Sequence, residues 1–137
     1  MTADDFDTLK AFTVSIGANH VAEICLQRPE ALNSMNADFW RELPEIVDAL
    51  DSQGSARVII LRSSGKHFTA GMDLSVLSNM GDDPDQEPAR QAEKLRRWIL
   101  SLQDTFTQLE TARMPVISAI QGACIGGGVD MVCATDV

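Results

Sequence analysis

Two short stretches of the sequence alternate apolar and polar residues. They cover residues 12–16 and 22–26, and residues 17–20 separate the two stretches. Alternation with a period of two is typical of a strand that buries one face. An antiparallel hairpin is therefore predicted.

Two other stretches place apolar residues at helical spacing. Asn36 is a suitable N-cap for the first helix and Gly54 a suitable end, while Pro44 inside it predicts either a kink or a later start because proline removes a helix hydrogen bond. A second apolar stripe runs through residues 95–109 and predicts a helix that ends near Arg113. We expect that stripe to pack in the core or against another subunit.

Two continuous apolar runs, 58–61 and 116–120, are typical of buried strands in a parallel sheet that is covered on both faces. Alternation of strands and helices implies right-handed crossovers and an α/β fold. Each run leads into a loop that contains glycine, and such loops leave a parallel sheet at the same edge. Residues 81–88, with four acidic residues and two prolines, predict a mobile loop.

Composition and charge narrow the possible partners. Apolar residues make up 45% and charged residues 23% of the 137 residues, as in ordinary globular domains. The formal net charge is −9, so we expect neither nucleic acid nor an anionic membrane as a partner, because both favour a basic face. The three cysteines form no CxxC pair, and the acidic N-terminal residues do not resemble a secretory signal. A reducing, cytoplasmic location is expected.

The most informative stretch for chemistry is 126–130, Gly-Gly-Gly-Val-Asp, which closely follows the last apolar run. A glycine turn that opens a helix leaves the first helical N–H groups unpaired, and such groups stabilise an oxygen that becomes anionic. Asp130 comes three residues after Gly127 and would supply an acid/base group on the same helix face. The other loop, 70–73, offers a second backbone N–H. One donor from each loop could therefore converge on one carbonyl oxygen.

Plainer interpretations of these residues stay open. The glycines could mark only a close contact between a helix and a strand, and Asp130 could only stabilise the start of the helix. Asp73 suits a structural or capping carboxylate. Cys124 suits a buried, inert thiol, and His67 suits a solvated pair with Lys66. Neither histidine has a partner at ligand spacing, so no metal site is predicted.

Three segments together resemble the crotonase (enoyl-CoA hydratase/isomerase) superfamily. They are 28–35 (RPEALNSM), 68–74 (FTAGMDL) and 122–130 (GACIGGGVD), and they occur in the order and spacing of that family. Asp130 stands where the hydratases of the family usually carry glutamate. Within the superfamily, the sequence is therefore most similar to the Δ3,5-Δ2,4-dienoyl-CoA isomerases.

This resemblance implies a fold, a site and a substrate. The fold would be α/β, a stack of ββα units known as the ClpP/crotonase fold. The oxyanion donors would be the N–H groups of Met72 and Gly127, and Asp130 would be one of the catalytic carboxylates. Contacts with coenzyme A would come from Arg28, Ala31, Leu32, Ala70, Gly71, Met72, Asp73, Leu74 and Gly127. The substrate would be an acyl-CoA thioester, with no separate cofactor.

The resemblance also sets expectations about length. Members of the family are considerably longer, so residues 1–137 are expected to be an N-terminal core domain, truncated before further acidic groups and before the helical region that builds trimers or hexamers. We expect dienoyl-CoA isomerisation from the full-length protein, and no turnover from residues 1–137 alone. The alternatives are another crotonase activity, such as enoyl-CoA hydration, and a non-catalytic acyl-CoA-binding or scaffolding remnant.

Overall fold

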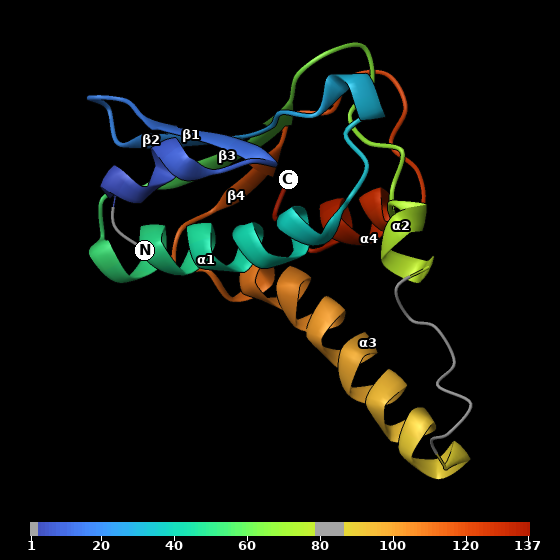
Figure 1. The fold of residues 1–137 in the computed structure, drawn as a ribbon. Coiled ribbons are helices and arrows are strands. Elements are labelled where there is room, and N and C mark those ends of the chain that lie inside the picture. The colour runs from blue at the N-terminus through green and yellow to red at the C-terminus, as the bar shows by residue number, and fades with distance from the viewer. Residues whose placement is uncertain (1–2, 79–86) are drawn as a thin grey trace.

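The computed structural model describes residues 3–78 and 87–137. The elements in chain order are the 3₁₀ helix η1 (Ala3–Thr8), β1 (Phe12–Ile16), β2 (Val21–Leu26), the 3₁₀ helix η2 (Pro29–Ala31), α1 (Ala37–Gln53), β3 (Val58–Ser63), α2 (Leu74–Ser78), α3 (Pro88–Thr111), β4 (Val116–Ser118) and α4 (Gly127–Cys133). The strands form one sheet in the order β1-β2-β3-β4. Figure 1 shows α1 beneath this sheet and the C-terminal end of α3 beneath α1.

The sheet contains the predicted hairpin and the predicted parallel pairs. β1 and β2 are antiparallel, with Phe12 opposite Leu26. β2 runs parallel to β3, with Ile24 opposite Leu61, and β3 runs parallel to β4, with Leu61 opposite Ser118. The α/β prediction is confirmed, although the last strand is shorter than its apolar run.

Helix α1 has both of its predicted boundaries. The Asn36 side-chain oxygen accepts the Phe39 N–H at 3.0 Å, and Gly54 ends the helix in the left-handed region with φ +62°. The predicted later start is wrong, because the cap at Asn36 begins the helix well before Pro44 and the helix continues through it. The side chains that α1 buries in the core include Phe39, Leu43, Ile46, Val47 and Leu50.

Only one face of the sheet is covered in the described part of the chain. Along β3, Ile59 and Leu61 are fully buried, whereas Val58 and Ile60 are half-buried and Arg62 is exposed. Among residues 3–78 and 87–137, no helix lies on the face opposite α1 (Figure 1). The prediction of a strand covered on both faces is therefore wrong for this chain, because apolar residues occupy both faces of β3 but helices pack on one.

Helix α3 carries the predicted stripe but buries only its end. Leu109 is 1% exposed, and the ring of Phe106 lies 5.2 Å from the ring of Trp40 on α1. Leu95 and Ile99, nearer the start of the helix, are each 41% exposed. In Figure 1 the yellow N-terminal end of α3 extends away from the sheet. The prediction of core packing is thus confirmed for the C-terminal half of the stripe, and subunit packing stays a prediction for the rest.

The predicted mobile loop, 81–88, falls mostly outside the described residues. Its last residue, Pro88, begins α3, where a proline is well tolerated because the first N–H of a helix has no helical partner.

Within 3–78 and 87–137, no helix is both long and apolar enough to cross a membrane. No three His, Cys, Asp or Glu side chains in those ranges gather closely enough to hold a metal ion.

Candidate active site

The two glycine-containing loops lie side by side beyond the carboxyl ends of β3 and β4. Thr69 pairs with Cys124 in an isolated parallel bridge. In this bridge the Thr69 N–H donates to the Ala123 carbonyl and the Ile125 N–H donates to the Thr69 carbonyl, both at 3.2 Å. The loops therefore extend the parallel pairing of the two strands, as their common sheet edge predicts.

Gly71 and Gly126 form the closest contact between the loops. Gly71 has φ +85°, and a Cβ atom there would lie 2.7 Å from the Ile125 carbonyl oxygen and 3.2 Å from the Gly127 nitrogen. A side chain cannot occupy a space bounded so closely by another backbone. Gly126 also has a positive φ, +57°, and its Cβ position is 3.7 Å from the Gly71 Cα. Glycine at position 71 is thus required for the start of α4 to lie against this loop.

The backbone N–H groups of Met72 and Gly127, the two predicted oxyanion donors, belong to the segments that meet at this contact. The Met35 N–H donates to the Gly71 carbonyl (2.8 Å) and the Asp73 N–H donates to the Met35 carbonyl (3.1 Å). In a parallel bridge of this kind the N–H of the middle residue, Met72, faces the opposite side. Within the described residues, neither the Met72 N–H nor the Gly127 N–H donates a hydrogen bond. The two predicted oxyanion donors therefore belong to segments that touch at Gly71, and both are free to bind a ligand.

Asp130 lies in the first turn of α4, three residues after Gly127. Its side chain is exposed and has no hydrogen-bond or ion-pair partner in residues 3–78 and 87–137. Within those ranges the carboxylate is therefore not committed to a structural contact.

Cys124 lies in the same region but is half-buried rather than buried as predicted. Desolvation raises the pKa of its thiol, and the neighbouring Cys133 raises it further. A thiol with a raised pKa stays protonated near neutral pH and is a weak nucleophile. All three cysteines are free, as their spacing predicts.

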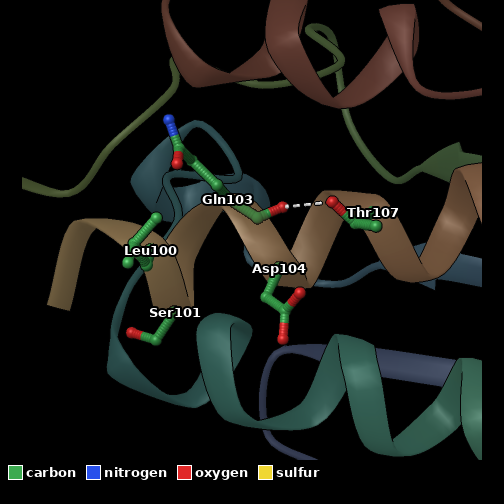
Figure 2. A pocket seen from close by; sticks show the side chains of 5 residues that line it. All are labelled: Leu100, Ser101, Gln103, Asp104 and Thr107. Carbon is green, nitrogen blue, oxygen red and sulfur yellow. Dashed lines mark hydrogen bonds between the residues drawn. The ribbon is translucent and has the colours of Figure 1, made fainter. Parts of the chain in front are cut away.

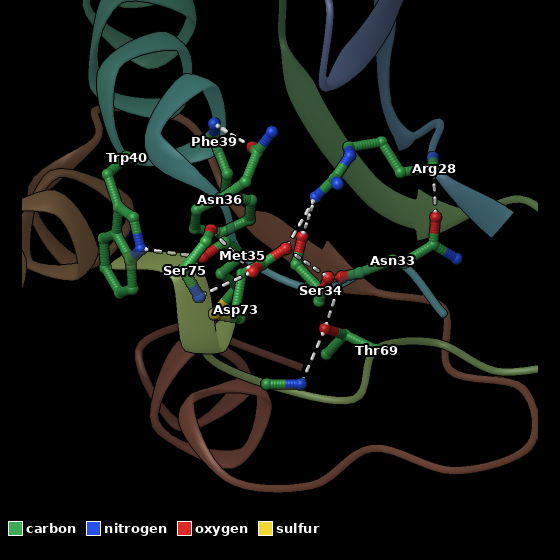
Figure 3. A network of polar contacts seen from close by, with 11 residues as sticks. Arg28, Asn33, Ser34, Met35, Asn36, Phe39, Trp40, Thr69, Asp73 and Ser75 are labelled. Carbon is green, nitrogen blue, oxygen red and sulfur yellow. Dashed lines mark hydrogen bonds and ion pairs between the residues drawn. The ribbon is translucent and has the colours of Figure 1, made fainter. Parts of the chain in front are cut away.

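Asp73 joins two of the predicted coenzyme A segments (Figure 3). The Ser75 hydroxyl and N–H donate to its Oδ1 at 2.7 and 3.0 Å, and the Ser34 hydroxyl donates to its Oδ2 at 2.9 Å. Arg28 Nη1 lies 3.5 Å from Oδ2 and donates to the Ser34 carbonyl at 2.7 Å. The bonds from Ser75, then that from Ser34, then the charge of Arg28, lower the pKa of Asp73 to about 2. Asp73 is thus an ionised acceptor that ties the segments together, as its structural interpretation predicts.

The remaining predicted coenzyme A residues lie along the same junction. Ala31 ends η2, and the carbonyl of the next residue, Leu32, accepts the Ala70 N–H at 2.9 Å. The side chains of Leu32 and Leu74 are 53% and 76% exposed. The structure therefore brings all of the predicted site residues except Asp130 and Gly127 to one junction. Gly127 lies against Gly71, and Asp130 follows it in the first turn of α4.

Asn33 and Thr69 join the site segments by hydrogen bonds, a role that the sequence did not predict. The buried Asn33 amide donates to the carbonyls of Ser64 (2.8 Å) and His67 (3.1 Å). The Thr69 hydroxyl donates to the Asn33 carbonyl (2.7 Å) and accepts the Gly71 N–H (3.1 Å). These three bonds of Asn33, to Ser64, His67 and Thr69, join residues 31 to 36 positions apart, so the sequence does not show which distant partners Asn33 binds.

His67 is the clearest correction at the site. The predicted solvated pair with Lys66 is wrong, because the His67 ring is half-buried and its Nδ1 accepts the Ala123 N–H at 3.0 Å. A Cβ atom at Gly122 would lie 2.8 Å from the same nitrogen. The ring thus packs directly on the second glycine loop, 56 positions away, which a local reading of the sequence does not show.

A surface depression elsewhere lacks comparable chemistry. Figure 2 shows its lining side chains, which all come from α3: Leu100, Ser101, Gln103, Asp104 and Thr107. The Thr107 hydroxyl donates to the Gln103 carbonyl at 3.2 Å, a bond within the helix. None of the predicted site residues lines this depression, and its one carboxylate has no convergent donor, so the loop junction is the better candidate.

Comparison with known proteins shows the family of this chain. The family model described as enoyl-CoA hydratase/isomerase matches residues 17–137, which includes all three motif segments. The chain belongs to the enoyl-CoA hydratase/isomerase family. An enoyl-CoA hydratase structure from Shewanella pealeana ATCC 700345 has a TM-score of 0.83 over 96% of this chain and 47% of that chain, at 20% identity. This likeness shows that the chain has the crotonase fold of the family.

Individual relatives indicate a narrower group within the family. The chain is 40% identical to the peroxisomal Δ(3,5)-Δ(2,4)-dienoyl-CoA isomerase of Arabidopsis thaliana, over all of this chain and 50% of that protein. It is 40% identical to the mitochondrial enzyme of Rattus norvegicus, over 93% of this chain and 39% of that protein. The chain thus spans about half the length, or less, of the curated relatives it matches. A Thermobifida fusca YX enoyl-CoA hydratase, solved with acetoacetyl-CoA, has a TM-score of 0.77 and 28% identity over 98% of this chain and 52% of that chain.

The expected cytoplasmic location is wrong. The relatives in this family are named as peroxisomal in Arabidopsis and mitochondrial in rat and human. Free cysteines and an acidic N-terminal segment are compatible with any compartment that keeps thiols reduced. These features therefore do not separate the cytoplasm from the interior of an organelle.

Proposed function

We propose that the protein is an acyl-CoA isomerase that shifts the double bonds of a dienoyl-CoA thioester through an enolate. The observation that carries this proposal is the pair of unpaired N–H groups of Met72 and Gly127, in loops that touch at Gly71, with the exposed Asp130 one helical turn away. The isomerases of Arabidopsis and rat, at 40% identity, support the dienoyl substrate.

The proposed mechanism uses the charge that develops on the thioester oxygen. This oxygen accepts the N–H groups of Met72 and Gly127, and loss of a proton from the conjugated chain converts it to an enolate oxygen. A preorganised donor of this kind contributes about 2.7–4 kcal/mol to lowering the barrier. Asp130 moves a proton at one end of the diene while another proton arrives at the far end. Both double bonds shift, and the substrate gains and loses one proton.

We assign coenzyme A binding to the junction of 28–35 with 70–74. Bonds from Ala70 to Leu32 and between Met35 and the 71–73 backbone hold these segments together, which supports a single continuous surface. The exposed side chains of Leu32 and Leu74 offer apolar contact on it. Arg28 uses Nη1 within the protein, and no bond from its Nε or Nη2 occurs in the described residues, so these groups are assigned to the coenzyme A side.

The complete protein is expected to assemble as a trimer or hexamer, as the family resemblance implies. Size-exclusion chromatography with light scattering tests this assembly independently of activity.

The test of the function uses the complete gene product and the variant Asp130→Asn. A 3,5-dienoyl-CoA should be converted to the 2,4-isomer, whose double bonds are conjugated with the thioester and absorb at longer wavelength. Asp130→Asn should lower kcat by about 10²–10⁴ while substrate affinity changes little, because only proton transfer is lost. The matched control is Asp48→Asn, an exposed carboxylate on α1 outside the site.

Three results would contradict the proposal in different ways. Turnover of a 2-enoyl-CoA with water, without isomerisation, would assign the site to hydration. Binding of dienoyl-CoA with no turnover would indicate a non-catalytic acyl-CoA-binding protein. Unchanged kcat in Asp130→Asn would leave Asp130 with the role of stabilising the helix start.

A further inference from the structure

The His67 ring holds the second glycine loop by its backbone. Its Nδ1 lies 3.0 Å from the Ala123 nitrogen. A backbone N–H only donates, so Nδ1 must accept, and the proton of the neutral ring must then lie on Nε2. Because the donor is backbone, this bond requires a neutral ring with its proton on Nε2.

Ala123 is held on both sides by consecutive residues of the first loop. Its carbonyl accepts the N–H groups of Phe68 (2.9 Å) and Thr69 (3.2 Å), while its N–H donates to the His67 ring. Gly122 has φ +60°, and a Cβ atom there would lie 2.2 Å from the Lys66 carbonyl. The backbone on either side of Ala123 therefore has little room to move while the His67 bond is in place.

This bond lies between the strand end and the proposed donor at Gly127. The next anchor along the loop is the Ile125 N–H, which donates to the Thr69 carbonyl at 3.2 Å, and Gly126 then packs on Gly71. Loss of the His67 bond would leave the Ala123 N–H without its acceptor and would loosen the segment that presents Gly127 to Met72. Oxyanion donors act through preorganised positions, so loosening of this kind lowers the rate of the chemical step.

Protonation of the ring would break the bond. A charged imidazole carries a donor on both nitrogens, so the Nδ1–H and the Ala123 N–H would face each other. The titratable residues on the segments packed around the ring, 28–34, 63–68 and 121–126, are Arg28, Glu30, Lys66 and Cys124. No hydrogen bond or ion pair in the described chain joins any of them to the ring. The Ala123 N–H is therefore the group that competes with the proton at Nδ1.

We propose that unprotonated His67 is a positioning residue for the oxyanion site, holding Gly127 against the Met72 loop through Ala123. This inference rests on the proposed function of Met72 and Gly127. It predicts that activity is lost on the acid side of the pH profile as the ring takes up a proton.

The experiment compares His67→Asn and His67→Ala in the complete gene product. The Asn Oδ1 occupies a position close to that of Nδ1 and accepts a hydrogen bond at every pH, whereas Ala offers no acceptor. kcat and KM for a 3,5-dienoyl-CoA are measured from pH 5 to 9, and binding of acetoacetyl-CoA is measured at both ends of that range. The matched control is His20→Asn, which changes the exposed hairpin histidine at φ +62°.

His67→Asn should keep kcat within about threefold of wild type near neutral pH and flatten the acid limb, while His67→Ala should lower kcat about 10–100-fold with a smaller change in KM. His20→Asn should leave the profile unchanged. If the acid limb of His67→Asn is identical to that of wild type, the inference is overturned. This measurement tests the inference even if His67→Ala does not fold. Wild-type protein that does not isomerise dienoyl-CoA, yet binds acetoacetyl-CoA with a pH dependence that His67→Asn removes, would support the role of His67 and reject only the dienoyl substrate. Wild-type protein that neither isomerises nor binds would reject both.

Discussion

The candidate site and helix α3 are held in opposite ways. The site consists of loops and short helices, yet hydrogen bonds donated by Asn33 and Thr69 and accepted by Asp73 and His67 join its three segments. α3 is the longest regular element, with 24 residues, and its N-terminal half exposes apolar side chains such as Ile99. In this fold, a segment with regular helical hydrogen bonds is therefore not necessarily better fixed to the rest of the protein than a loop.

The difference between the site and α3 follows from which partners their backbone groups bind. A helix satisfies its backbone within itself and needs side-chain burial to be fixed on the protein. A loop must find partners elsewhere for its buried N–H and C=O groups, and each partner found is a link between distant segments. Among the N–H groups of the site loops that donate no hydrogen bond within the described residues are those of Met72 and Gly127, and these are the two that we propose a substrate binds.

Gly127→Pro is expected to lower activity strongly, because it removes one proposed N–H donor of the site loops and keeps the hydrogen bonds that join these loops. Proline at the first position of α4 is compatible with a helix start but has no N–H. We expect kcat to fall by about 10²–10³, the loss for one oxyanion donor. Steady-state kinetics on a dienoyl-CoA, together with circular dichroism, measure the rate and the fold.

Gly127→Ala is the matched control, because it keeps the N–H. Its Cβ would lie 3.2 Å from the sulfur of Met35, the flexible end of a long side chain that can move aside. Folded Gly127→Pro protein with full activity would remove Gly127 from the site.

The next prediction compares the loss of stability from a substitution near each end of α3. Leu109→Ala should lower the free energy of unfolding by about 2–3 kcal/mol because it leaves a cavity in the core. Ile99→Ala, on the same stripe, should cost less than about 0.5 kcal/mol because the side chain is already 41% exposed. Urea unfolding of both variants of the complete protein measures the two changes in the free energy of unfolding. Equal losses would show that the complete protein covers the N-terminal half of the stripe as well.

The smallest effect concerns the acceptor that links the site segments. The pKa of Asp73 is about 2, below its ordinary 3.8, so its bonds stabilise the folded protein above about pH 4 and that contribution is lost as the pH falls toward 2. Asp73→Asn should therefore cost about 1 kcal/mol at neutral pH, after allowance for solvent screening, and less at pH 3. Urea unfolding at both pH values measures this, with the exposed Asp104→Asn on α3 as control. A cost that does not shrink at pH 3 would show that the charge of Asp73 is not what stabilises the site.

Sequence patterns were sufficient where the cause of a structure is local. Asn36 and Gly54 bound α1 because capping depends on a few neighbouring residues. The meeting of the loops at Gly71 and Gly126 was also predictable, because parallel strands deliver their following loops to one edge.

Patterns were insufficient where the partner is distant. His67 looked solvated because nothing near it in sequence shows that Ala123 lies beside the ring. The apolar run of β3 did not show that helices cover only one face, and the stripe of α3 did not show which half is buried. Periodicity identifies an apolar face, but the fold decides what covers it.

The order of the strands along the sheet has a kinetic consequence. Each strand pairs with the one made just before it, so the sheet can form in the direction of synthesis, although each of its two parallel pairings closes a long crossover that contains a helix. Segment 121–127 is made after the other parts of the site and docks on a loop that is already anchored to β3. A growing chain therefore forms β1 to β4 before it brings Gly127 to Met72, and the proposed oxyanion site is assembled only in this last docking step of these elements.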